Sequence, residues 1–96
     1  MSLKFEWGPK KAAANLSKHG VSFEEGLTVF ADPLARIFDD EDHSDEECRE
    51  ISIGHAANNK QLLVVCFTAR ETAVRLFSAR KASKMEHKDY EETVKP

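Results

Sequence analysis

With 96 residues the chain is long enough for one small hydrophobic core and too short for two, so we expect a single domain over residues 1–96. Its 41% hydrophobic and 32% charged residues are typical of a soluble globular protein. The longest apolar run, residues 62–67, is far shorter than the roughly 20 residues of a membrane-spanning helix, and no apolar signal region opens the chain. Because its two cysteines form no disulfide framework, we expect a cytoplasmic protein without membrane contact.

The net charge of −3 conceals two segments of opposite sign. Residues 39–50 hold eight acids and one base, a net of −7, whereas residues 51–88 hold seven bases and two acids, a net of +5. An acidic total argues against nucleic-acid binding, but a local basic patch sets the electrostatic field at a site. The basic segment therefore leaves a nucleic acid open as ligand, and the alternative interpretation is that both segments are solvated surface.

The first third of the chain predicts one strand and a helical hairpin. Apolar and polar residues alternate over residues 3–7, which is typical of a short strand. A helix is expected over residues 9–19, because proline suits a first helical position and Gly20 suits a left-handed end. Ser22 and Glu25 have the spacing of a capping box, which predicts the start of a second helix. The core-facing stripe of this second helix consists of Phe23, Leu27 and Phe30.

The middle of the chain predicts an antiparallel sheet. Alternating or apolar runs indicate strands over residues 34–40, 49–55, 62–68 and 73–79. The third run is apolar on both faces, as expected of a central strand that is covered on each side. Asn58 and Asn59 mark a tight turn, and the short connection between the last two runs favours a meander of antiparallel neighbours.

A last helix is expected to start at Lys84, because Ser83 and Glu86 again have capping-box spacing, and to end near residue 92. Its apolar stripe is thin and consists of Met85, Tyr90 and Val94. Such a stripe predicts loose packing, or packing against a partner. The complete order predicts an α+β fold in which the N-terminal strand and helical hairpin pack on an antiparallel meander sheet, followed by a C-terminal helix.

The stretch Val74 to Glu86 predicts an anion-binding site. Arg80 and Lys81 stand just ahead of the expected last helix, whose first amides are unpaired and carry partial positive charge. Such a helix end suits a phosphate, and an arginine can hold a phosphate with its planar fork. Lys84, at the first helical position, adds a further cation.

Strand alternation bears on which arginines join Arg80. In a regular strand Arg75 lies on the opposite face from Arg80, so we expect Arg70 to be the partner and Arg75 to contribute less. Arg49 lies at the start of its strand and could reach the edge of the site. The alternative interpretation is that these cations are surface residues, or pair with the acidic segment.

The sequence leaves the proton-transfer group of such a site open. Histidine is the usual candidate near neutral pH. His19 ends a helix, where it either caps the helix dipole or serves the site, and His43 lies in the acidic segment. His55 is expected to be exposed near a turn, and Tyr90 either packs or transfers a proton. The His and Cys spacings match no zinc site and no phosphate-binding glycine loop occurs, so we expect no metal and no cofactor.

Several motifs in chain order resemble the BrnT family of bacterial type II toxins. Residues 5–33, FEWGPKKAAANLSKHGVSFEEGLTVFADP, are similar to the opening pattern of that family. The later matches are Asp42-His43-Ser44, Glu46-Glu47-x-Arg49, Ile53-Gly54 and Val74-Arg75-Leu76-x-Ser78-Ala79-Arg80-Lys81-Ala82. The resemblance spans about residues 4–92. It departs from the family at Gly8, where Asp is common, and at Gly26, where Ala is usual.

This resemblance implies a RelE-like ribonuclease fold, endoribonuclease activity that arrests growth, and a co-encoded BrnA-like antitoxin. Such an antitoxin is a ribbon-helix-helix protein whose complex with the toxin binds promoter DNA. A metal-free ribonuclease uses the RNA 2′-hydroxyl as nucleophile, so it needs a base, an acid and cations at the phosphate. The predicted catalytic residues are Arg80, Arg70, Arg49, His43 and His19, and the predicted RNA-phosphate-binding residues are Lys81, Arg75 and Lys84. The alternative function is a non-catalytic partner or corepressor of a DNA-binding antitoxin.

Overall fold

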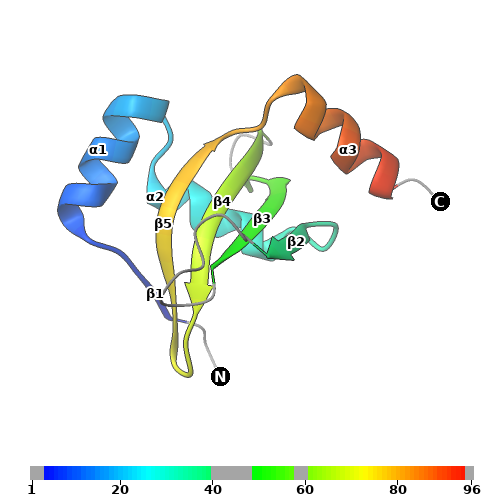
Figure 1. Cartoon of the computed structure of the whole chain (residues 1–96). Coiled ribbons are helices and arrows are strands. Elements are labelled where there is room, and N and C mark those ends of the chain that lie inside the picture. Colours follow the sequence, from blue (N-terminus) through cyan, green and yellow to red (C-terminus); the bar gives the residue numbers. More distant parts are fainter. Residues whose placement is uncertain (1–3, 40–48, 58–60, 95–96) are drawn as a thin grey trace.

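The computed structural model describes residues 4–39, 49–57 and 61–94 and has an α+β architecture (Figure 1). The elements in chain order are β1 (Lys4–Glu6), α1 (Pro9–His19), α2 (Phe23–Leu27), the 3-10 helix η1 (Thr28–Ala31), β2 (Arg36–Asp39), β3 (Glu50–His55), β4 (Leu62–Ala69), β5 (Ala73–Lys81) and α3 (Lys84–Val94). This order confirms the predicted strand, helical hairpin, meander and last helix. The second helix tightens into η1 before it ends, and the turn expected at Asn58 and Asn59 lies outside the described residues.

Local sequence signals set the ends of the two helices of the hairpin. Gly20, at φ 70°, ends α1 in the predicted left-handed conformation. Ser22 Oγ accepts a hydrogen bond from the Glu25 amide and the Glu25 carboxylate accepts one from the Ser22 amide, which confirms the capping box of α2. Gly8 caps α1 without a side-chain hydrogen bond, so this helix lacks the cap that an aspartate could supply.

Within the described residues, five strands form one sheet in the order β1-β5-β4-β3-β2. The four later strands pair with antiparallel neighbours, as predicted, and β4 lies between β3 and β5. β1 instead pairs parallel to β5, with Lys4 to Glu6 opposite Ala73 to Arg75. The first strand of the chain therefore extends the sheet beside its last strand.

A β-bulge interrupts the pairing between β4 and β5. Cys66 lies opposite Ser78, but the next residue of β4, Phe67, lies opposite Leu76. Phe77 is therefore an extra residue in β5, and the inside-outside alternation of that strand shifts by one position there.

The bulge brings Arg75 and Arg80 onto the same face of the sheet. Arg75 lies opposite Thr68 and Arg80 lies opposite Val64, and these two β4 residues share a face because they are an even number of positions apart. The prediction that the two arginines lie on opposite faces is wrong. It assumed a regular strand, and the extra residue Phe77 removes that regularity.

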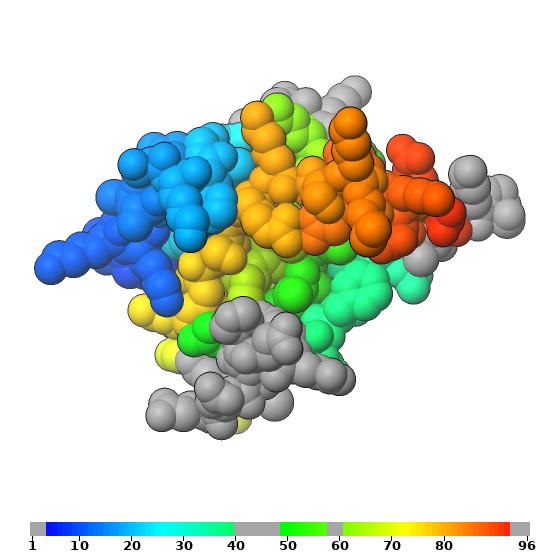
Figure 2. Space-filling view, turned by 45° about the horizontal axis from the view of Figure 1, so that its top comes forward, coloured from blue at the N-terminus to red at the C-terminus, as the bar shows by residue number. Residues whose placement is uncertain are grey.

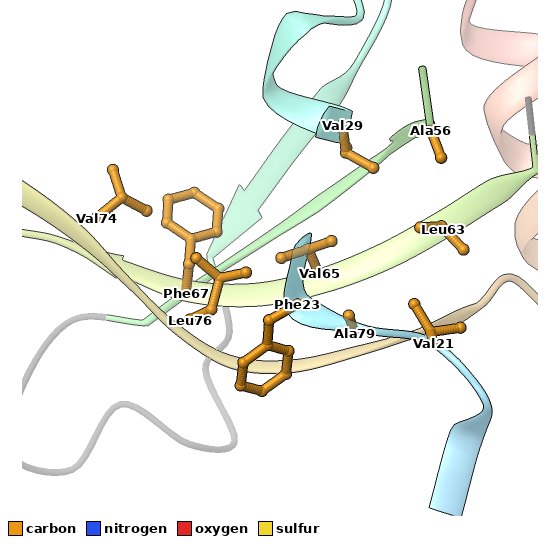
Figure 3. Close-up of a cluster of buried hydrophobic side chains, with 10 residues drawn as sticks. All are labelled: Val21, Phe23, Val29, Ala56, Leu63, Val65, Phe67, Val74, Leu76 and Ala79. Carbon is orange, nitrogen blue, oxygen red and sulfur yellow. The ribbon is translucent and has the colours of Figure 1, made fainter. Parts of the chain in front are cut away.

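The main hydrophobic core lies between the sheet and the layer of α2 and η1 (Figure 3). Its buried side chains are Val21, Phe23, Val29, Ala56, Leu63, Val65, Phe67, Val74, Leu76 and Ala79. A Cβ atom added to Gly26 of α2 would lie 3.0 Å from the Cβ atom of Ala79, so the glycine allows α2 to approach β5 closely. This close approach gives a physical reason for a glycine inside this helix, despite its cost in helix stability.

The buried side chain of Asn15 joins α1 to β5. Its Nδ2 group donates hydrogen bonds to the carbonyl oxygens of Ala79 at 2.8 Å and Val21 at 2.9 Å. Its Oδ1 atom accepts a hydrogen bond of 3.1 Å from the Ala79 amide. One side chain thus pairs with both backbone groups of Ala79, beyond the three residues of β5 that β1 covers. This contact fixes α1 against β5.

α3 packs on the other face of the sheet through Tyr90, which is 4% exposed. Tyr90 joins Ile53, Leu62 and Val64 in a second hydrophobic cluster. The predicted loose packing therefore holds for Met85, which is 73% exposed, but not for Tyr90. The Val94 side chain lies outside the described part of the structure. No helix among the described residues is long and apolar enough to cross a membrane.

Candidate functional site

The sheet face that carries Arg75 and Arg80 lies opposite the layer of α2 and η1, and we call it the open face (Figure 2). In Figure 2 it lies between α1, in blue, and α3, in orange and red. The strand register places on it Arg75, Ser78 and Arg80 from β5, Val64, Cys66 and Thr68 from β4, and Ile51 and Ile53 from β3. Because α3 packs near Ile53 and Val64, it covers one end of this face.

Arg80 is held at the start of α3 by Glu86. Its Nη1 and Nη2 groups donate to the two carboxylate oxygens at 2.7 and 2.8 Å, and Nη1 also donates to the Lys81 carbonyl at 3.3 Å. These contacts use three of the five N–H donors of the guanidinium. Among the described residues, its Nε edge has no partner, and the Arg80 side chain is 41% exposed. The planar fork is thus oriented by one carboxylate and keeps a second edge for an anion.

Glu86 has two structural roles and is unsuited to proton transfer. Its carboxylate accepts a hydrogen bond of 2.8 Å from the Ser83 amide, so it completes the predicted capping box of α3 while it pairs with Arg80. The hydrogen bond from Arg80 lowers the pKa of Glu86 to about 2, and the Ser83 amide adds to this against the opposing effect of burial. The same pair raises the pKa of Arg80. Since a general base works best with a pKa near the operating pH, we assign Glu86 a positioning role.

Arg70 and Arg75 both face Glu6 of β1. The distances from Glu6 Oε1 are 3.5 Å to Arg70 Nη1 and 3.9 Å to Arg75 Nη1. Arg70 lies in the turn before Val74, and the six positions from Val74 to Arg80 correspond to roughly 20 Å along the strand. The structure therefore does not bring together Arg70 and Arg80, the pair that the sequence favoured.

Phe77, the bulged residue, is contacted by two cations. The guanidinium carbon of Arg49 lies 4.1 Å from the centroid of the Phe77 ring, and Lys11 Nζ lies 5.0 Å from it. Arg49 was predicted from the sequence to reach the edge of the site, but Phe77 and Lys11 were not singled out. The sequence signal for Phe77 was its place between Arg75 and Arg80 in one strand. That signal points to a site only once the bulge is known, because the bulge decides which face each side chain takes.

A groove of about 210 Å³ runs between α1 and β5. It is lined by Lys11, Ala14, Asn15, Lys18, His19, Phe77 and Ser78. The groove brings His19, a residue predicted from the sequence, next to the strand segment that leads to Arg80. Lys18 was not predicted, although its spacing from Lys11 puts both on one side of α1. The groove thus combines positive charge, one histidine and one aromatic ring.

The other predicted residues contribute less to this face. Lys81 is exposed and lies opposite the core residue Leu63, so its side chain belongs to the other side of the sheet. Lys84 is exposed on the first turn of α3. His43 lies outside the described residues.

A second polar cluster, formed by Asp32, His55 and Tyr90, joins η1, β3 and α3. Asp32 Oδ2 accepts hydrogen bonds from the His55 amide at 2.8 Å and the Tyr90 hydroxyl at 3.2 Å, and it lies 3.5 Å from His55 Nδ1. The rings of His55 and Tyr90 meet edge to face at 5.2 Å. Beside the cluster lies a cavity of about 500 Å³ lined by Thr28, Ala31, Asp32, His55, Ala56 and Ala57.

The ionisation of this second cluster favours a structural role. Burial raises the pKa of Asp32, but hydrogen bonds from the amides of His55 and Leu34 and from the Tyr90 hydroxyl outweigh this effect, so the pKa lies below its ordinary value. The pKa of Tyr90 is raised by burial and by the charge and hydrogen bond of Asp32. Tyr90 therefore keeps its proton at neutral pH and is a poor base. Asp32 was missed from the sequence, and no three His, Cys, Asp or Glu side chains in the described ranges gather as a metal-binding group.

Comparison with known protein families identifies the chain. The family model for the ribonuclease toxin BrnT of type II toxin-antitoxin systems matches residues 7–86. A comparison with individually curated proteins finds no significant match. The matched range covers most of the chain, from Trp7 before α1 to Glu86 in the first turn of α3, and includes every strand except β1. The chain therefore belongs to the BrnT family of ribonuclease toxins of type II toxin-antitoxin systems.

Proposed function

We propose that this toxin cleaves RNA through attack of a 2′-hydroxyl on the adjacent phosphate, without a metal ion, on its open face. The observation that carries the proposal is the bulge at Phe77, which gives Arg75 and Arg80 a common exposed face beside the groove with His19. Membership of a ribonuclease toxin family supplies the RNA substrate. The positions of Arg75, Arg80 and His19 support the open face as the place where the RNA phosphate binds.

Arg80 is the proposed phosphate-binding residue. The 2′-oxygen forms a bond to phosphorus while the bond from phosphorus to the 5′-oxygen breaks, and negative charge builds up on the non-bridging oxygens. The Nε edge of Arg80 can donate to those oxygens while Glu86 holds the opposite edge at 2.7 and 2.8 Å. A fixed donor that needs no rearrangement stabilises the transition state more than a mobile one.

His19 is the proposed proton-transfer residue within the described chain. One group must remove the 2′-hydroxyl proton and one must protonate the leaving 5′-oxygen. His19 lines the same groove as Ser78, which is two residues from Arg80. His43 remains a second candidate on the sequence alone, because it lies outside the described residues. Arg49 and Arg75 then serve the RNA backbone rather than proton transfer.

The proposed partner is a BrnA-like ribbon-helix-helix antitoxin that blocks the open face. Family membership implies an antitoxin, and Arg75 and Arg80 on the open face give that partner a charged surface to cover. Promoter DNA is bound only by the complex, through the antitoxin. We place this activity in the cytoplasm, where messenger RNA is translated.

Single 2′-deoxy substitutions test the mechanism. The isolated chain is incubated with an RNA oligonucleotide, and with a copy that carries one deoxynucleotide on the 5′ side of the cleaved bond. We expect cleavage of the first and none at the substituted position of the second, because the nucleophile is missing there. A chain that binds its antitoxin but leaves both oligonucleotides intact would instead be a non-catalytic partner.

A further inference from the structure

Among the residues that the structure describes, Phe77 lies outside both hydrophobic clusters. It belongs neither to the core between the sheet and α2 nor to the cluster around Tyr90. As the extra residue of a bulge it is also not needed to keep the strand in register. An aromatic ring at a bulge that lines a groove calls for another explanation, since bulges often direct a side chain at a functional site.

The surroundings of Phe77 are basic on two sides. Arg49 of the β3 end lies 4.1 Å from the ring centroid, and Lys11 of α1 lies 5.0 Å from it. The negative face of an aromatic ring attracts such cations. The groove continues from there along Lys18 and His19. Positive side chains therefore surround the Phe77 ring, and they could bind the phosphates of a nucleic-acid backbone.

We infer that Phe77 is a stacking platform for one unpaired nucleobase of the RNA, with Lys11, Lys18 and Arg49 contacting the adjacent phosphates. This inference rests on the proposed function, because it extends the substrate site along the α1–β5 groove. Unpaired bases stack on aromatic side chains, and every base has a π-face for this contact. A base that stacks on Phe77 displaces a cation from the ring, and the displaced group remains within reach of the phosphate of that base.

Charge and shape favour single-stranded RNA over a protein segment as the occupant. The groove is small, at about 210 Å³, and among its lining residues the ionisable groups are Lys11, Lys18 and His19, with no acid. Asn15 is already bonded to the backbone of Ala79, so the polar contacts available to a ligand are mostly cationic. A nucleotide combines a flat base with a negative phosphate, which matches this lining.

The test measures binding of a short single-stranded oligonucleotide that cannot be cleaved because each 2′-hydroxyl is methylated. Affinity is followed by fluorescence anisotropy for the wild type, Phe77→Trp and Phe77→Leu. Leucine keeps an apolar side chain but has no ring, whereas tryptophan keeps the stacking surface. We expect Phe77→Trp to bind at least as well as the wild type, and Phe77→Leu to bind about 10-fold more weakly. Thermal unfolding of each variant checks that the fold is retained.

Removal of bases one at a time makes the test specific for stacking. We expect one abasic position to weaken binding of the wild type and to have no further effect on Phe77→Leu, because the same contact is already lost. The inference is overturned if the wild type binds no oligonucleotide, if Phe77→Leu binds like the wild type, or if the abasic loss is equal in both. It is also overturned if Phe77→Leu loses affinity only for the antitoxin.

The two proposals fail in different ways. If the wild type cleaves RNA while Phe77→Leu binds and cleaves equally well, the platform is refuted and the proposed function stands. If the wild type cleaves no RNA but its binding still depends on Phe77 and on one base, cleavage is refuted and the platform stands.

Discussion

Arg80 and Glu86 face each other across the junction of β5 and α3, with two N–O distances of 2.7 and 2.8 Å. The same carboxylate caps the helix through the Ser83 amide. The residue that fixes the proposed phosphate-binding fork therefore also fixes the start of the helix that carries Tyr90. Orientation of the site and docking of α3 are linked through one side chain.

Glu86→Gln separates the two roles of this carboxylate. Glutamine can still complete a capping box, but it no longer forms an ion pair. The pair is partly exposed, at 41% for Arg80 and 26% for Glu86, so we expect a loss of roughly 0.5–1 kcal/mol in the free energy of unfolding. RNA cleavage should fall because Arg80 is less well oriented. Urea unfolding and cleavage rates measure both effects, with Glu91→Gln on the same helix as control, and a cleavage rate equal to wild type would remove the positioning role.

The contribution of the Arg80–Glu86 pair should depend on pH in a defined direction. The pKa of Glu86 is lowered from 4.5 to about 2 in the folded chain. A lowered carboxylate pKa gives stability that is fully present above the unfolded value and is lost as the pH falls through the folded value. The difference in unfolding free energy between wild type and Glu86→Gln should thus be constant above about pH 5 and shrink toward pH 2. A difference that stays the same through this range would contradict the assignment.

Arg80→Lys should slow cleavage strongly, whereas Arg70→Ala should leave it nearly unchanged. Lysine keeps the charge but cannot present two parallel donors, so we expect a rate about 100-fold lower for Arg80→Lys. Arg70 lies roughly 20 Å away along the strand, so Arg70→Ala should cleave nearly as fast as the wild type. Initial cleavage rates at saturating RNA decide the matter. A larger defect in Arg70→Ala than in Arg80→Lys would restore the pairing that strand alternation first suggested.

Asn15→Ala should destabilise the fold strongly, although it changes only one polar side chain. It leaves the amide and the carbonyl of Ala79 and the carbonyl of Val21 without their partner in a buried region. Unsatisfied buried groups cost about 1–3 kcal/mol each, and water can enter to reduce the sum, so we expect a loss of about 2–3 kcal/mol. Urea unfolding measures it, with the exposed neighbour exchange Ser17→Ala as control. A loss below that of the control variant would show that Asn15 does not hold α1 to β5.

Tyr90→Phe tests whether the hydroxyl of this residue takes part in cleavage. It removes the hydrogen bond to Asp32 and keeps the ring in its cluster with Ile53, Leu62 and Val64. We expect a loss of about 1 kcal/mol in stability and a cleavage rate near that of the wild type. Cleavage and thermal unfolding are measured together. If Tyr90→Phe stays folded under the assay conditions but cleaves RNA much more slowly than the wild type, Tyr90 is a proton-transfer residue.

Local patterns in the sequence predicted most of the fold. The capping boxes of Ser22 and Ser83, the left-handed Gly20 and the doubly apolar run of β4 each depend on neighbours within a few residues. Those signals suffice to locate helices and strands and to predict an antiparallel meander.

The features that were missed depend on tertiary contacts. The bulge at Phe77 reflects how β5 fits against β4, and no residue of the strand marks it in advance. β1 pairs parallel to β5, and the Asn15 side chain pairs with the backbone of Ala79. Both contacts join residues that are more than 60 positions apart. Arg80 and Arg49 therefore remain site residues predicted from the sequence, whereas the partner of Arg80 was assigned through a strand regularity that the structure does not keep.

The most direct measurement is the chemistry of the RNA ends produced by the purified chain, freed from any antitoxin and assayed with a chelator. The proposed mechanism predicts fragments with a 2′,3′-cyclic phosphate and a 5′-hydroxyl, formed at the same rate with and without the chelator and about 100-fold more slowly by Arg80→Lys. Intact RNA, cleavage abolished by the chelator, or fragments with a 5′-phosphate would contradict it.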